Sequence, residues 1–81
     1  MSQEASTLDF VVTLVRRLFN NESITEQDDF FEQGGDSIAA IDFIALVQQE
    51  YGIKLDLVTL FEQRQLYKLA DIIMSKIQHG H

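Results

Sequence analysis

The sequence predicts an all-α fold, a small bundle of three long helices and one short helix, and three observations support it. The 81 residues suffice for one domain, and they include no proline and only four glycines, the residues that most often interrupt helices. Apolar residues in three stretches recur at steps of three and four, as on one face of a helix. Hydrophobic residues make up 46% of the chain and charged residues 23%, a globular balance. We expect a single domain over residues 1–81, with an ordered core over about 6–77.

The first helix is predicted over Leu8–Phe19. Ser6 precedes it and Asp9 follows Ser6 by three residues, an acidic variant of the capping box, and Asn20-Asn21 offers a stop. Its apolar face consists of Leu8, Val11, Val12, Val15, Leu18 and Phe19.

A connection of roughly 17 residues, Asn20–Asp36, follows the first helix. Its two ends have turn chemistry, and its apolar residues Ile24, Phe30 and Phe31 show no helical period. Connections of this length are usually functional or anchored by their own side chains. We therefore expect Ile24 and one or both phenylalanines to hold the connection to the core, with a partner contact as the alternative role of the phenylalanines.

The second helix is predicted over Ser37–Tyr51, with Asp36 or Ser37 as its cap and Gly52 as its stop. A short helical turn is expected near Leu57–Glu62, and a last long helix over about Leu66–Ile77.

Two apolar sectors divide the second helix when residues are placed about 100° apart. The core sector contains Ala40, Phe43, Ile44, Val47 and Tyr51. The second sector contains Ile38, Ile41 and Ala45, beside Ser37. A second sector next to an exposed serine indicates a docking patch. The alternative is that the long connection folds back over Ile38 and Ile41, and both can be partly true.

The chain around Ser37 suits a covalently attached anion. Gly34 and Gly35 have no side chains, so the segment just before the helix has little bulk and Ser37 projects at the helix N-terminus. Unpaired N–H groups and the positive end of the helix dipole favour a phosphate ester there. The alternative is a glycine turn followed by an ordinary serine cap.

The run Phe30-Phe31-Glu32-Gln33-Gly34-Gly35-Asp36-Ser37-Ile38 resembles the phosphopantetheine attachment signature of thiolation domains, the peptidyl carrier proteins of nonribosomal peptide synthesis. The resemblance covers about Leu8 to Ile77, nearly the whole chain. It continues in Tyr51-Gly52-Ile53, Leu60-Phe61-Glu62, Leu66 and Leu69-Ala70.

This resemblance implies an acyl-carrier-protein-like four-helix bundle with 4'-phosphopantetheine esterified to Ser37. The arm would hold an aminoacyl, peptidyl or acyl group as a thioester, and the carrier itself would not be an enzyme. The implied partners are a phosphopantetheinyl transferase, an adenylating or acyl-loading enzyme, and condensing or tailoring enzymes. Asp36, Ile38, Ile41 and Ala45 would contact these partners.

Two departures from the family pattern affect these expectations. Arg64-Gln65 stands where many thiolation domains have Pro-Thr, so the third helix should run more smoothly into the fourth. Asp36 stands where chain-elongating thiolation domains often have histidine, and aspartate is found there in some peptide carriers and in polyketide and fatty-acid carriers. A polyketide-type acyl carrier is therefore an alternative.

The charge and composition disfavour other functions. Six basic against thirteen acidic residues give a net charge of -7, which repels nucleic acid. The absence of cysteine excludes disulfides and thiolate metal ligands, and no apolar run approaches the ~20 residues of a membrane span. The amino terminus also lacks the basic start of a signal peptide. We expect a cytoplasmic monomer without nucleic-acid or membrane partners.

The chain offers little for catalysis. Its histidines, His79 and His81, lie in a tail expected to be frayed, so no metal site or triad is predicted. The pairs Asp28-Asp29 and Arg16-Arg17 are expected to face water. The remaining alternative is an unmodified helical interaction module that uses the same apolar patch. The flanks contain no linker-like tract, which favours a free-standing protein over an excised domain.

Overall fold

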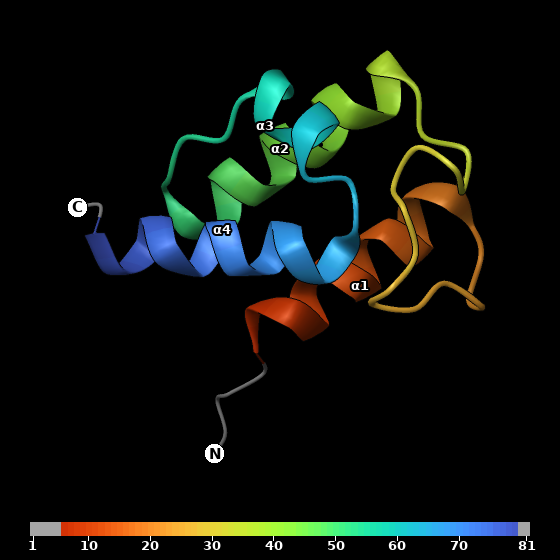
Figure 1. The fold of residues 1–81 in the computed structure, drawn as a ribbon, viewed down its shortest axis with the longest axis horizontal. Helices are drawn as coiled ribbons and strands as arrows, with labels where there is room; N and C mark the ends of the chain where they lie inside the picture. Colours follow the sequence, from red (N-terminus) through yellow and green to blue (C-terminus); the bar gives the residue numbers. More distant parts are fainter. Residues whose placement is uncertain (1–5, 80–81) are drawn as a thin grey trace.

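The computed structural model describes residues 6–79, which form four helices: α1 (Thr7–Phe19), α2 (Ser37–Tyr51), α3 (Leu57–Glu62) and α4 (Leu66–His79) (Figure 1). No strand occurs among these residues, and Asp29 and Gln65 form an isolated antiparallel bridge. The prediction of an all-α fold with three long helices and a short one is confirmed. α2 and α3 have the predicted bounds, and α1 begins one residue before its predicted start.

Side-chain and backbone caps explain the ends of α1 and α2. The Ser6 hydroxyl accepts a hydrogen bond from the backbone N–H of Asp9 at 3.0 Å, as the capping pattern predicts. α1 stops at Asn20, which adopts the left-handed conformation with φ 51°, and α2 stops at Gly52 with φ 68°. The predicted stops are both confirmed, because these two residue types tolerate positive φ.

The last helix is longer than its apolar periodicity predicts. α4 continues past Ile77 to His79, two residues beyond its predicted end, while Gly80 and His81 lie outside the described residues. The helix continues because α4 itself contains no glycine or proline. Within residues 6–79, neither α4 nor any other helix combines the length and apolar character needed to cross a membrane.

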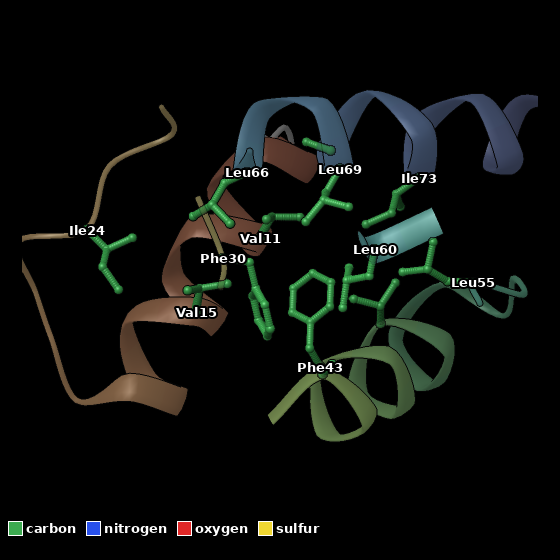
Figure 2. Packing of buried hydrophobic residues seen from close by; sticks show 13 residues of the cluster. Val11, Val15, Ile24, Phe30, Phe43, Leu55, Leu60, Leu66, Leu69 and Ile73 are labelled. Carbon is green, nitrogen blue, oxygen red and sulfur yellow. The ribbon is translucent and has the colours of Figure 1, made fainter. Parts of the chain in front are cut away.

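One core draws on every helix and on the long connections (Figure 2). α1 packs mainly against α4, and the ring of Phe30 lies between Val15 of α1 and the ring of Phe43 on α2. The buried residues are Val11, Val15, Ile24, Phe30, Ala40, Phe43, Val47, Leu55, Leu60, Leu66, Leu69, Ala70 and Ile73.

The connection between α1 and α2 is anchored as predicted. Ile24 and Phe30 are fully buried, and Phe31 is half-buried. Arg16 corrects the expectation that both arginines of α1 face water: its Nε donates to the carbonyl oxygen of Ile24 at 2.8 Å. Arg16 therefore ties the connection to α1, whereas Arg17 is exposed.

The expectation that α3 runs smoothly into α4 is wrong. α3 ends at Glu62, and Gln63 leaves the helix with φ -117° and ψ 77°. The first N–H groups of α4, those of Leu66 and Tyr67, donate to the carbonyl oxygens of Asp28 and Glu26 at 3.1 and 2.9 Å. The long connection thus supplies the cap that a Pro-Thr pair would otherwise provide, so the break between the helices is retained.

Candidate functional site

Ser37 is the first residue of α2, and its side chain is exposed. Of the two capping candidates, Asp36 takes the role, because its Oδ1 accepts from the N–H of Ala39 at 2.9 Å. Within residues 6–79, the Ser37 hydroxyl makes no hydrogen bond to protein. The serine is therefore not an ordinary cap, and its oxygen is available for modification.

The backbone beside Ser37 suits a phosphate group. Within the described residues, the N–H groups of Ser37 and Ile38 donate to no protein acceptor, since they precede the first helical hydrogen bond, from Ala40 to the carbonyl of Asp36. Both lie at the positive end of the helix dipole, where anions are stabilised. A phosphodiester on the Ser37 oxygen fits this surrounding, and the exposed position leaves room for a long arm.

Both glycines before the serine are structurally required. Gly34 has φ 116°, in a region that other residues rarely adopt. A Cβ on Gly35 would lie 2.6 Å from the carbonyl oxygen of Phe30 and 2.7 Å from its ring carbons. The backbone at Gly35 therefore rests on the buried Phe30 ring, which fixes where α2 begins and where Ser37 projects.

Asp29 holds the turn that leads into the glycines, so the expectation that Asp28 and Asp29 simply face water is wrong. The Asp29 Oδ1 accepts from the N–H groups of Phe31 and Glu32 at 2.8 and 3.2 Å. The Asp28 Oδ2 accepts from the N–H of Thr25 at 2.7 Å. Both carboxylates serve the backbone of the connection rather than forming a catalytic pair.

The second apolar sector of α2 lies in solvent. Ile38 is 72% exposed and Ile41 57% exposed, and Ala45 is exposed as well. The alternative that the long connection covers Ile38 and Ile41 is therefore wrong. Together with Ser37 and Asp36, these side chains form one exposed surface at the start of α2.

Helix α3 adds two exposed apolar residues that the sequence analysis missed. Val58 is 63% exposed and Phe61 46% exposed, on a helix that packs beside α2. The signal was available, because four of the six residues of α3 are apolar and so short a helix buries only one side. Leu60 takes the buried side and Leu57 is half-buried.

Outside this surface, the described residues show no metal-ligand cluster and one perturbed carboxyl group. Among them, no group of three or more His, Cys, Asp or Glu side chains is placed to hold a metal ion. The one resolved pKa shift among these residues lies at the N-cap of α3. There, hydrogen bonds from the backbone and side chain of Thr59 hold the pKa of the Asp56 carboxyl below its ordinary value.

Comparison with known proteins places this arrangement in a family. The protein-family model described as "phosphopantetheine attachment site" matches residues 9–73, which include Ser37. Surfactin synthase subunit 1 of Bacillus subtilis is 35% identical over 65 residues, and the match covers 80% of this chain and 2% of that protein. The chain thus spans a small fraction of the length of this curated relative.

Solved structures agree in fold over nearly the full chain. An active-site mutant peptidyl carrier protein, solved in solution, has a TM-score of 0.85 at 26% identity, covering 99% of this chain and 93% of its own. A chain in the complex of the phosphopantetheine transferase Sfp with coenzyme A and a peptidyl carrier protein has a TM-score of 0.83 at 27% identity, covering 86% and 91%.

The family carries 4'-phosphopantetheine, and its carrier domains do not themselves catalyse reactions. The helical bundle, the serine at the start of α2 and the glycine turn before it agree with that role. The chain therefore belongs to the phosphopantetheine attachment family, and its fold matches that of solved peptidyl carrier proteins.

Proposed function

We propose that Ser37 carries the 4'-phosphopantetheine arm and that the chain presents an aminoacyl or peptidyl thioester to enzymes of nonribosomal peptide synthesis. The observation that carries this proposal is the exposed Ser37 hydroxyl, which has no protein hydrogen-bond partner within residues 6–79 and stands beside two unpaired N–H groups. The surfactin synthase relative supports the peptide-synthesis type.

The residues of the chain act by positioning. The Ser37 oxygen would form the ester, and the N–H groups of Ser37 and Ile38, which have no protein acceptor within residues 6–79, would be available to hold its phosphate. Asp36 keeps the helix start in place by capping it. When bound, the arm supplies a thiol that holds the cargo as a thioester, and its flexible length raises the concentration of that cargo at a partner's active site. The chain has no catalytic activity of its own in this proposal.

We propose that partners dock on Asp36, Ile38, Ile41 and Ala45, together with Val58 and Phe61 of α3. The occupant we infer first is a phosphopantetheinyl transferase, because a similar chain is solved with one. Loading, condensing and tailoring enzymes would use the same surface in turn. Neither α2 nor α3 contains a basic residue, which favours partners with basic residues around an apolar groove.

We place the carrier in the cytoplasm, where coenzyme A is available as the donor of the arm. We also infer a monomer, because a net charge of -7 on so small a chain disfavours self-association.

The test is the intact mass of the chain after incubation with coenzyme A and a broad-specificity phosphopantetheinyl transferase. We expect the mass of one phosphopantetheine to be added to the wild type and not to Ser37→Ala. The variant should still fold, since Asp36 rather than Ser37 caps α2. No gain on a folded wild type, with a transferase shown to modify another carrier, would favour an unmodified interaction module.

A polyketide-type acyl carrier is the second candidate, favoured by aspartate rather than histidine at position 36. The two candidates differ in which enzyme loads the arm. Loading of the modified chain by an adenylating enzyme supports the peptide type, whereas loading only by an acyltransferase supports the acyl type.

A further inference from the structure

Arg64 contacts three consecutive residues of the α1–α2 connection. Its Nε lies 3.1 Å from Oδ2 and 3.3 Å from Oδ1 of Asp29. Its guanidinium carbon lies over the ring of Phe31, 5.2 Å from the centroid. Its carbonyl oxygen accepts from the N–H of Phe30 at 2.8 Å. One residue thus engages the connection through an ion pair, a cation–π contact and a backbone hydrogen bond.

The three contacted residues set the position of the serine. Asp29 caps the turn that precedes the glycines, through the N–H groups of Phe31 and Glu32. The N–H of Gly35 donates to the carbonyl of Phe30 at 3.1 Å, and Gly35 lies against the Phe30 ring. Residues 29–31 are therefore the base on which the segment leading to Ser37 rests.

On its other side, Arg64 follows α3 by two residues. Phe61 of α3 stacks on Phe31, with centroids 4.6 Å apart and planes 11° apart. Phe31 in turn meets the buried Phe30 edge-on, with centroids 5.0 Å apart. These contacts connect the exposed side of α3 to the base of the Ser37 segment.

Helix α3 depends on such contacts for its orientation. Six residues are too few for a helix that is stable by itself. Leu60 is its one fully buried residue and Leu57 packs on the core beside it, so few buried side chains fix the rotation of the helix. Besides these core contacts, the Phe31–Phe61 stack and the contacts of Arg64 with Phe31 and Asp29 oppose rotation of α3.

We infer that Arg64 is a positioning residue for partner docking: it holds α3 against the Ser37 segment, so that Val58 and Phe61 keep a constant placement relative to the serine. The inference rests on the proposed function, since docking there is what the placement serves.

The experiment compares Arg64→Met with Arg17→Met, which removes the same charge from an exposed position of α1. Transferase-catalysed loading is measured with the carrier concentration varied. We expect Arg64→Met to raise the KM for the carrier about 3- to 10-fold with kcat within about twofold, because docking weakens while the serine stays reactive. Arg17→Met should leave both parameters near wild type.

Two further variants separate positioning from general stability. Asp29→Asn keeps the Oδ1 acceptor for the turn but removes the charge that pairs with Arg64. Its effect on KM should be smaller than that of Arg64→Met, and the two effects should not add in the double variant. Arg64→Lys keeps the charge without the planar guanidinium and should recover part of the loss. The ring-proton resonances of Phe31 and Phe61 should shift in Arg64→Met and not in Arg17→Met.

The outcomes distinguish the two proposals. An unmodified wild type overturns the proposed function, and the docking role of Arg64 with it. A wild type that is loaded normally, beside an Arg64→Met variant with unchanged KM, overturns the inference alone. Equal KM changes in Arg64→Met and Arg17→Met would also overturn it, because they would reflect net charge rather than the placement of α3.

Discussion

The two apolar sides of α2 have the same chemistry and opposite surroundings. Ala40, Phe43 and Val47 are fully buried against the other helices, whereas Ile38 and Ile41 point into solvent on the same helix. The buried side gains stability from the removal of apolar surface from water. The exposed side gains none while the chain is alone, and its value lies in binding.

α1, by contrast, is a helix whose apolar residues all contribute to the core. Val11 and Val15 are buried, and the other apolar residues of α1 are half-buried beside them, while Thr13 and Arg17 are exposed. α2 has four apolar residues on its exposed side, Ile38, Ile41, Ala45 and Leu46. Hydrophobicity alone therefore does not identify the core, and the angular position of each residue on the helix does.

The largest effect is expected from a substitution on the buried side of α2. Phe43→Ala removes a ring that lies 5.4 Å from that of Phe30 in the middle of the core. We expect the free energy of unfolding to fall by about 3–5 kcal/mol, a large part of the total for a small domain. Denaturant unfolding measures this change. A loss below about 1 kcal/mol would contradict the assignment of this side to stability.

Gly35→Ala tests the link between the core and the serine. The added Cβ would lie 2.6 Å from a backbone oxygen and 2.7 Å from a buried ring, neither of which yields easily. We expect a loss of about 1–3 kcal/mol in unfolding free energy and slower loading of Ser37. Unfolding and loading both equal to the wild type would show that the glycine is not packed in this way.

Ile41→Asp tests the exposed side of α2, where we expect a substitution to weaken binding and leave stability nearly unchanged. The unfolding free energy should change by no more than about 0.5 kcal/mol, since the side chain is largely in water. The KM for the carrier in transferase loading should rise roughly fivefold or more, because a charge enters an apolar contact. Ser75→Asp on α4 adds the same charge elsewhere and serves as the control. A large fall in melting temperature with unchanged loading would refute the docking assignment.

The smallest effect concerns the start of α3. The Asp56 carboxylate accepts from the N–H of Thr59 at 2.8 Å, and this hydrogen bonding lowers the pKa of Asp56 from its ordinary value. A group with a lowered folded pKa stabilises the fold above its unfolded pKa, and loses that contribution as the pH falls through the folded pKa. Asp56→Asn should therefore be slightly less stable than wild type at neutral pH, with the difference vanishing in acid. Thermal unfolding from pH 7 to pH 2 measures it, and a difference that grows in acid would contradict the sign.

Much of the site follows from local sequence. The bounds of α2, the Ser6 and Asn20 ends of α1, and the exposed sector beside Ser37 were all predicted correctly, because caps and helical periodicity act over three or four residues. The burial of Ile24 and Phe30 also followed from their being apolar in a long connection. The attachment role of Ser37 stays a prediction that rests on the same local pattern.

What the sequence by itself determined is thus the set of helices, the place of Ser37 at the start of one of them, and the angular separation of the two apolar sides. Only the tertiary structure decided which polar residues hold the long connection: Arg16, Asp29 and Arg64 each engage partners on another element. It also decided that α3 and α4 remain separate, through carbonyl oxygens from Asp28 and Glu26 about 40 residues earlier in the chain. Such contacts depend on the packing of elements far apart in sequence, and a pattern read over one or two helical turns does not contain them.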